Sequence, residues 1–399
     1  MSKHILIVSA VFPPEPVVSA RLSFDIYHSI KKQGADTKVF HPKASRPNGY
    51  QFDISGTVDE NEIVPNTFVY PQSSLFGRFR ESYSFGKATS RYIKQHHSEI
   101  EAIYANTWPL FGQLFLAKAA KKHGIPYFIH IQDIYPESYC YKMPKIIGSV
   151  MSLFLMPIDK YVLRNAKGVI AISPSMISYL SESRNVDISR FTLVRNWQDD
   201  QSYYNAYTPI ESQTGVCHIM YLGSINPTAN VTQIINAVSG LDPSRFHLSI
   251  IGDGPDRGNC QGLARDLKLD ITFGSVTSDK VAQKQGEADV LVLCLKKGVA
   301  KTATPSKLTA YMYSGRPIIA SVDLDSDCAN IIRESGCGIV VEPENVGALA
   351  QAMQTLANKS IEELNDMGKS GFKYADEHLS KQKNLNNITE ILLKGTNND

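Results

Sequence analysis

The chain has 399 residues, of which 43% are hydrophobic and 20% charged, and its formal net charge is +2. This composition is ordinary for a soluble globular protein of two or three domains, and a chain of this length can bury sizeable cores without disulfides or a structural metal. Its six cysteines include no pair at CxxC spacing, which argues against a zinc site or a redox motif.

Strand and helix patterns alternate from the first residues onward. His4–Ala10 is a short apolar run with β-branched residues, typical of a buried parallel strand. No charged-then-apolar leader precedes it, so we expect a reduced protein in the cytoplasm. After a loop with three prolines, Leu22, Ile26 and Ile30 recur at four-residue spacing and predict a helix. Thr37–Phe40 predicts the next strand, which completes a βαβ unit of a doubly wound parallel sheet.

The rest of the first half is less regular. Residues 41–75 are rich in Pro, Asn, Ser and Gly and predict loops and short strands. Further strands, separated by helix patterns, are predicted at Ala102–Asn106, Tyr127–Ile131 and Gly168–Ile172.

One apolar stretch, Ile146–Ile158, has thirteen residues without charge and is flanked by Lys142, Lys145 and Lys160. It is too short to span a bilayer, which needs about 20 apolar residues. Two alternatives stand: an amphipathic helix in a membrane interface, or a buried helix of the first domain. The first half also carries 23 Lys and Arg against 16 Asp and Glu over residues 1–199, a balance that suits an anionic membrane or a phosphate-bearing acceptor unless it is chance.

The βα pattern starts again after a polar segment, residues 200–215, which we interpret as a linker. Two domains of similar size follow from this, residues 1–200 and 201–399, with a final helix able to pack back on the first. Predicted strands of the second half are Cys217–Leu222, His247–Ile251, Asp289–Leu295, Pro317–Ser321 and Gly338–Val341. Its predicted helices are Val231–Val238, Gly262–Leu267, Lys307–Tyr313, Cys328–Glu334 and Val346–Ala357.

Polar motifs stand where parallel strands end, the edge at which open α/β sheets bind ligands. The stiff loop Phe12–Arg21 follows the first strand, and Arg21 is suited either to a phosphate or to a surface salt bridge. His130, Asp133 and Glu137 follow the strand Tyr127–Ile131, a polar cluster that is uncommon in pure scaffold, although Asp133 can also cap the next helix.

Two motifs of the second half suit a phosphate group. Ile251-Gly-Asp-Gly-Pro255 follows a strand but is neither GxGxxG nor a P-loop, so it is a weak signal for a dinucleotide or ATP and serves equally as a tight turn. In the segment Lys301–Pro317, Thr304 is a plausible N-cap and Pro305 suits a first helical turn. The N–H groups of Ser306, Lys307 and Leu308 would then face a pyrophosphate, aided by the helix dipole and the Lys307 charge.

In their order and spacing these motifs, with Ala171–Ser175 and Leu193–Trp197, make the chain resemble bacterial family-4-type glycosyltransferases of the branch that builds capsular or O-antigen polysaccharide. The resemblance runs over nearly the whole length. It implies the α/β GT-B fold, with two Rossmann-like domains and a cleft between them. It also implies a retaining hexosyl transfer from a nucleotide-sugar, which is a substrate rather than a cofactor, without a metal ion.

The resemblance also assigns roles to residues. His130, Asp133 and Glu137 are the expected catalytic residues on the acceptor side, where Arg21 is expected to meet a phosphate or the acceptor. The acceptor is a saccharide or a polyprenyl-diphosphate-linked sugar, nucleic acid is no partner, and peripheral contact with the inner face of the cytoplasmic membrane follows from such an acceptor. The expected donor-binding residues are Arg195, Gly223, Gly252, Gly254, Thr302, Thr304, Ser306, Lys307, Leu308 and Thr309.

The chain departs from the family pattern at the donor site. Many relatives carry two glutamates eight positions apart, and the corresponding positions here are Thr302 and Ala310. The loop Gly223–Asn230 also lacks the basic pair of the family, for which Arg195 is the candidate substitute. Two other functions therefore stand beside the transferase: a nucleotide-sugar 2-epimerase on the same fold, and a non-catalytic subunit that partners an active transferase.

Overall fold

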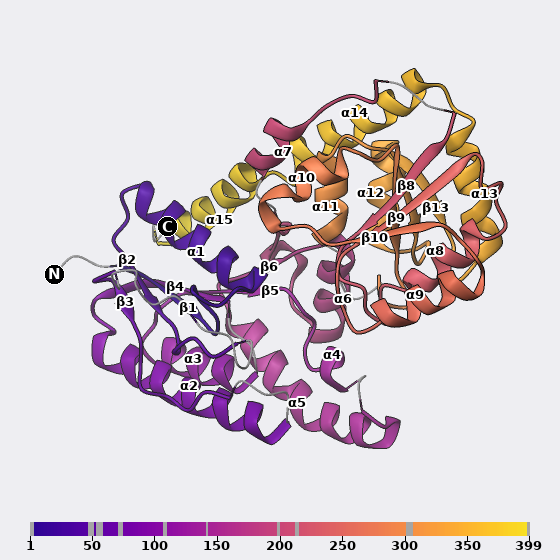
Figure 1. The fold of residues 1–399 in the computed structure, drawn as a ribbon. Coiled ribbons are helices and arrows are strands. Elements are labelled where there is room, and N and C mark those ends of the chain that lie inside the picture. Colours follow the sequence, from indigo (N-terminus) through magenta and orange to yellow (C-terminus); the bar gives the residue numbers. More distant parts are fainter. Residues whose placement is uncertain are drawn as a thin grey trace. The chain divides into compact units, whose positions relative to one another are not determined.

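The structure, a computed structural model, describes residues 4–46, 52, 59–70, 75–106, 110–140, 143–197, 200–211, 215–300 and 306–396. The chain divides into two compact units. We call them unit 1, Met1–Arg195 with Asn384–Asp399, and unit 2, Asn196–Lys383. Each unit is built on a parallel sheet with helices packed against it (Figure 1). The two parallel α/β units confirm the predicted fold class.

Unit 1 has seven strands in the order β3-β2-β1-β4-β5-β6-β7, and every pairing between them is parallel. Strand β1 (His4–Ser9) pairs with β2 (Thr37–Phe40) on one side and with β4 (Ile100–Asn106) on the other. The strand order therefore reverses between β1 and β4, which is the switch point where such sheets bind ligands. The other strands are β3 (Glu62–Ile63), β5 (Tyr127–Ile131), β6 (Gly168–Ala171) and β7 (Phe191–Leu193).

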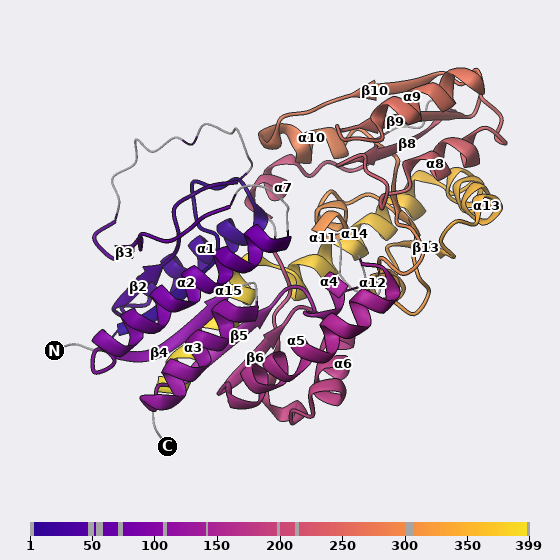
Figure 2. The ribbon, with the colours of Figure 1, turned by 90° about the horizontal axis from the view of Figure 1, so that it is seen from below.

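Helices cover both faces of the unit 1 sheet. Figures 1 and 2 show α2 (Leu75–His96), α3 (Leu110–Lys122) and α5 (Lys145–Asn165) on one face, with α3 between the other two. The opposite face carries α1 (Val18–Lys32) and the last helix, α15 (Lys381–Thr396). Burial on both faces explains why strands such as β5 and β6 are largely apolar rather than alternating. The unit also contains α4 (Glu137–Cys140), α6 (Pro174–Arg184) and the 3-10 helix Ile188–Arg190.

Unit 2 has six parallel strands in the order β10-β9-β8-β11-β12-β13, and its switch point lies between β8 (Cys217–Leu222) and β11 (Val290–Cys294). Successive residues of β8 enter different cores: Tyr221 packs in one hydrophobic cluster and Leu222 in the other. The remaining strands are β9 (Phe246–Ile251), β10 (Ile271–Gly274), β12 (Ile318–Ser321) and β13 (Gly338–Val341). The helices are α7 (Asp200–Ala206), α8 (Val231–Val238), α9 (Arg257–Asp266), α10 (Val281–Gln285), α11 (Ser306–Tyr313), α12 (Asp327–Ser335), α13 (Val346–Ala357) and α14 (Ile361–His378), with a 3-10 helix at Ser278–Lys280.

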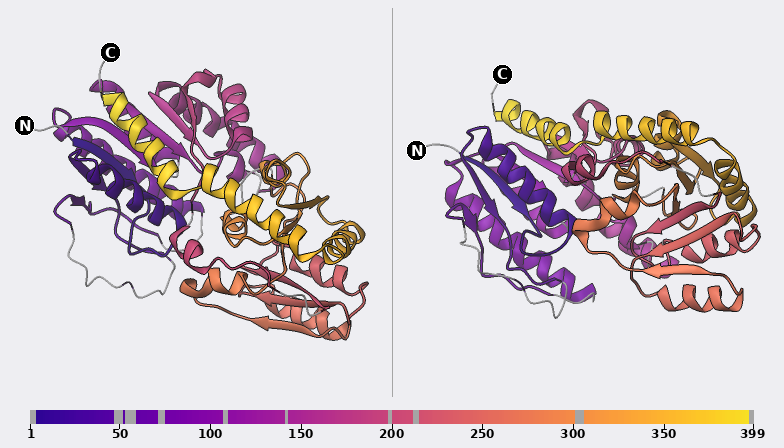
Figure 3. Two further views of the ribbon diagram at one scale, coloured as in Figure 1. Left: turned by 90° about the horizontal axis from the view of Figure 1, so that it is seen from above. Right: turned by 45° about the horizontal axis from the view of Figure 1, so that its top comes forward.

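The last helix belongs to unit 1 for most of its length. Figure 3 shows α15 lying over the unit 1 sheet. The hydroxyl of Thr389 on α15 lies 3.2 Å from that of Ser29 on α1, and the side-chain oxygen of Asn384 accepts a 2.9 Å hydrogen bond from the N–H of Arg195. The chain thus enters unit 2 near residue 196 and leaves it near residue 383.

Most predicted elements lie within one or two residues of the observed ones, with three differences. The predicted linker at residues 200–215 contains helix α7, because Tyr203 is buried there and its ring lies 6.0 Å from that of Tyr313. The predicted helix Gly262–Leu267 is only the second half of α9, whose first turn is polar. The sequence analysis made no prediction for the strands β7 and β10 or for the helices α10 and α14, and it expected the final helix α15 without giving its bounds.

Candidate functional site

A polar pocket of about 270 Å³ opens at the carboxyl edge of the unit 1 sheet. Ser19 follows β1, Asn106 ends β4 and His130 lies in β5, so the pocket lies at the switch point of the sheet. Most of its polar groups are hydroxyls and amides, which suit a ligand rich in hydroxyl groups. The pocket is lined by Ser19, Asn106, Gln113, His130, Ile131, Gln132, Asp133, Tyr135, Asp159, Leu163 and Leu180.

His130 is held neutral in this pocket. Its side chain is buried, with 2% of its surface exposed, and burial lowers the pKa of the imidazole to about 4. The hydroxyl of Tyr104 lies 2.6 Å from Nδ1 of His130 and has no other partner among the described residues. The phenol therefore donates to Nδ1, which leaves the ring proton on Nε2. Nε2 itself is buried and has no partner in the part of the chain that the structure describes, so it is an N–H donor available to a ligand.

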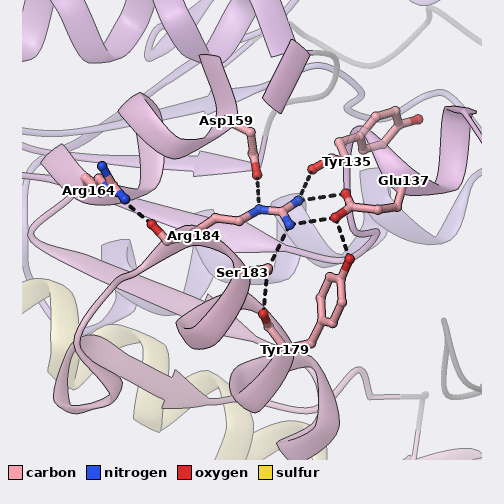
Figure 4. Close-up of polar contacts among 7 residues, drawn as sticks. All are labelled: Tyr135, Glu137, Asp159, Arg164, Tyr179, Ser183 and Arg184. Carbon is pink, nitrogen blue, oxygen red and sulfur yellow. Dashed lines mark hydrogen bonds and ion pairs between the residues drawn. The ribbon is translucent and has the colours of Figure 1, made fainter. Parts of the chain in front are cut away.

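The two predicted acids beside His130 have different surroundings. Asp133 is exposed and lines the pocket. Glu137 points instead toward Arg184, which donates to its two carboxylate oxygens over 2.6 and 2.7 Å, and Tyr179 donates a third hydrogen bond at 2.7 Å (Figure 4). Burial alone would raise the pKa of Glu137, but the hydrogen bonds from Arg184 and Tyr179 outweigh it and leave this pKa below its ordinary value.

Arg184 holds the loop after β5 in place. Its guanidinium is fully buried and donates to the carboxylate of Asp159 on α5 over 2.7 Å and to the carbonyl of Tyr135 over 2.7 Å, besides Glu137 (Figure 4). Burial raises the pKa of Asp159 to about 6, and Arg184 offsets part of that effect. One cation therefore ties the loop, α5 and α6 together behind the pocket. Glu137 is better placed to hold this loop than to meet a substrate.

The site of unit 2 lies where β8 and β9 end. Gly223 and Gly252 have φ of +149° and +148°, and a Cβ on Gly252 would lie 2.0 Å from the carbonyl oxygen of Gly223. The two loops also share a hydrogen bond of 2.8 Å from the N–H of Gly223 to the carbonyl of Ile251. Only glycine allows this close approach of two backbones. Gly254 is packed in the same way against the carbonyl of Ile225.

Lys307 reaches this glycine corner from the first turn of α11. A Cβ on Gly223 would lie 2.1 Å from Cε of Lys307. The ammonium lies 4.3 Å from the ring centre of Tyr221, donates a hydrogen bond to its hydroxyl, and lies 3.4 Å from the carbonyl of Ser224. Burial lowers the pKa of Lys307 to about 8. The first N–H groups of a helix have no partner within that helix, and together with this ammonium they make a corner suited to an anion.

The remaining predicted residues of unit 2 lie around this corner or outside the described part. Thr302 and Thr304 lie outside the described residues, as does the side chain of Ser306. The side chains of Leu308 and Thr309 are buried, so any contact they make with an anion at the helix start goes through their backbone N–H groups.

The two predicted arginines belong to unit 1. Arg21 is exposed on α1. Arg195 ends the first segment of unit 1, and one of its guanidinium nitrogens is buried and unpartnered among the described residues. The predicted site residues therefore divide between the units: Arg21, His130, Asp133, Glu137 and Arg195 lie in unit 1, and the glycines and the residues of α11 lie in unit 2.

Sequence reasoning missed Tyr104, Asp159, Arg184 and Tyr221. A signal existed for Arg184 alone, because it follows the buried Met176 and Leu180 at four-residue spacing on α6. An arginine that continues an apolar helix face indicates a buried ion pair. Within the described ranges, no group of three His, Cys, Asp or Glu side chains is placed to hold a metal ion.

Comparison with known proteins agrees with this division of the chain. Residues 22–197 match the family model described as a glycosyl transferase 4-like domain, and residues 217–359 match the model described as glycosyl transferases group 1. A curated relative is the "Probable glycosyltransferase WbjE" of Pseudomonas aeruginosa, which is 19% identical over 269 residues, 65% of this chain and 67% of that protein.

Solved structures share the fold over nearly the whole length. WaaG, a glycosyltransferase involved in lipopolysaccharide biosynthesis, superposes with a TM-score of 0.67 at 14% identity and covers 97% of this chain and 99% of its own. Anabaena HepE in complex with UDP gives a TM-score of 0.67 at 13% identity over 98% of this chain and 100% of its own. The complex of HepE with UDP-glucose gives a TM-score of 0.64 at 15% identity, over 98% of this chain and 99% of its own. At these identities the likeness establishes the fold.

Proposed function

The chain belongs to the glycosyltransferases, since residues 22–197 match a glycosyl transferase 4-like domain and residues 217–359 the group 1 model. From this premise we propose that it transfers a hexosyl group from a nucleoside-diphosphate sugar to a saccharide or lipid-linked acceptor. The transfer retains the configuration at the anomeric carbon, needs no metal ion, and serves the synthesis of cell-surface polysaccharide, of the capsule or O-antigen kind. The enzyme works in the cytoplasm, at the inner face of the cytoplasmic membrane.

The observation that carries the proposal is the corner formed by Gly223, Gly252 and Lys307 in unit 2. When the bond between the sugar and the diphosphate breaks, negative charge builds up on the diphosphate. An ammonium and free N–H groups fixed beside that charge lower the barrier, because they are already oriented before the reaction. HepE, which shares the fold, binds UDP and UDP-glucose, and this supports a nucleotide-sugar as the donor.

We assign the acceptor side to the unit 1 pocket. Its hydroxyl and amide lining suits the hydroxyl groups of a sugar. His130 contributes a hydrogen bond from Nε2 to a sugar oxygen; with a pKa of about 4 and its other nitrogen already occupied by Tyr104, it is not a general base at neutral pH. Asp133 is the exposed carboxylate of the pocket and is the group we assign to the acceptor hydroxyl.

A panel of nucleoside-diphosphate sugars tests the proposal. The matching donor should raise the melting temperature, because a ligand that binds the native state stabilises it by mass action. The same donor should then be consumed in the presence of a saccharide acceptor. The absent carboxylates at positions 302 and 310 favour a non-catalytic subunit as the second candidate. Donor binding without transfer or hydrolysis would support that subunit, and formation of a 2-epimer would identify an epimerase.

A further inference from the structure

The first ten residues of α5 expose a row of large apolar side chains. Their exposed fractions are between 51% and 82%, although residues of this kind are usually buried. Glycine at position 148 and Leu155 face the protein instead, so the exposed residues form one side of the helix. We call this side the α5 apolar face; it consists of Ile146 (82% exposed), Ile147 (53%), Val150 (51%), Leu153 (72%) and Phe154 (68%).

The charges next to this face have one sign. Lys145 begins the helix, and Lys160 and Arg164 lie toward its end, beside an open groove of about 680 Å³ that they line together with Leu153. The single acid of α5 is Asp159, which is buried and bound to Arg184. Across the exposed surface of α5, cations therefore frame the apolar side chains and no carboxylate neutralises them.

The helix cannot cross a bilayer in this fold. By length and composition alone α5 is the one helix in the described residues that could cross a membrane. Its charge-free stretch of thirteen residues, however, is about 20 Å long at 1.5 Å per residue, against about 30 Å of hydrocarbon. Its second half is also part of the core, since Val162 and Leu163 are fully buried and Asp159 anchors Arg184. Only the first half is available to a surface.

We propose that the α5 apolar face docks unit 1 onto the surface of an anionic lipid bilayer, with Ile146, Leu153 and Phe154 in the interface and the flanking cations at the headgroups. A helix with a large apolar side and basic flanks lies in the plane of the interface in this way. The docking rests on the membrane location given in the proposed function and names the surface that produces it. Neither Lys307 nor His130 takes part in it, so its test is independent of the transfer reaction.

The charges favour a bilayer over a second copy of the chain. If two α5 faces packed antiparallel, Lys145 of one copy would approach Lys160 and Arg164 of the other; if they packed parallel, Lys145 would meet Lys145. Both arrangements place like charges together with no exposed carboxylate on α5 to pair them. Anionic headgroups remove this repulsion, and each basic residue near such a surface strengthens binding about fivefold.

Sedimentation of the full chain with vesicles tests the docking. The wild type should sediment with vesicles of equal phosphatidylglycerol and phosphatidylcholine at low salt, more weakly with phosphatidylcholine alone, and less as salt rises, leaving a salt-resistant part from the apolar contact. The variant Leu153→Asp with Phe154→Asp should bind about a hundredfold more weakly, because each buried side chain of this size contributes at least about tenfold. Its melting temperature and its affinity for a nucleoside diphosphate should stay unchanged.

Two controls make the outcome decisive. Ile188→Asp with Leu324→Asp introduces the same charges at apolar residues that are 60% and 46% exposed elsewhere, and should bind vesicles like the wild type. Leu155→Asp, at an 8% exposed position next to the face, should instead lower the melting temperature. The proposal is overturned if the wild type does not sediment at low salt, if the control pair loses binding equally, or if Leu153→Asp with Phe154→Asp unfolds the chain. It is also overturned if light scattering shows a dimer that this variant dissociates, since the face would then be an interface between copies.

Discussion

Replacing Lys307 by alanine should weaken binding of the matching nucleoside diphosphate about 10- to 150-fold. The ammonium lies at the glycine corner, and a charge-assisted hydrogen bond to phosphate is worth roughly 1.5–3 kcal/mol. Titration calorimetry measures the change. Lys369→Ala is the matched control, because that side chain is 63% exposed on α14 and pairs only weakly, at 3.8 Å, with Asp366.

The pH dependence separates the charge of Lys307 from its volume. Burial lowers the pKa of Lys307 in the protein without bound diphosphate to about 8, so the ammonium is mostly present at pH 7 and mostly lost at pH 9. A bound diphosphate favours the charged form. Wild-type affinity should therefore fall about tenfold between pH 7 and pH 9, since one unit above its pKa a group is about one-tenth protonated. Lys307→Ala should lose this part of the pH dependence. Equal affinity of the variant and the wild type at pH 7, or parallel pH profiles, would refute the assignment.

Three further expectations follow from the site. Tyr104→Phe should lower turnover while binding of the donor nucleotide stays intact, because His130 then loses the partner that keeps its proton on Nε2. His130→Ala should lower turnover more than it lowers stability. If this variant merely unfolds, His130 is a structural residue. Arg184→Met should cost about 3–5 kcal/mol in urea unfolding, because it leaves Asp159 uncompensated in the core, and adding Asp159→Asn should recover part of the loss; an unchanged midpoint would contradict the role of the ion pair. Activity should persist in excess EDTA. A loss that magnesium or manganese restores would direct attention to the two carboxylate pairs of the sequence, Asp199 with Asp200 and Asp323 with Asp325.

The sequence alone predicted the fold class, because strand and helix periodicity is a local property of the chain. Apolar runs such as Tyr127–Ile131 and Cys217–Leu222 coincide with β5 and β8 because buried parallel strands need no polar alternation. Elements with weak periodicity escaped prediction. Helix α7 is polar apart from a few aromatic residues, and its stability comes from the packing of Tyr203 in the core of unit 2.

The sequence by itself also placed His130 at a strand end and Lys307 in the first turn of a helix, and the family resemblance added Gly223. What it could not decide is which partner each of them has. Glu137 and Arg184 are 47 residues apart, and Gly223 and Lys307 are 84 apart, so their contacts exist only once strands and helices pack. The sequence likewise could not predict whether α5 is exposed, because a stretch of thirteen charge-free residues is compatible with a protein core and with a membrane surface. Tertiary packing decided that question by burying Leu155 and leaving Leu153 and Phe154 outside.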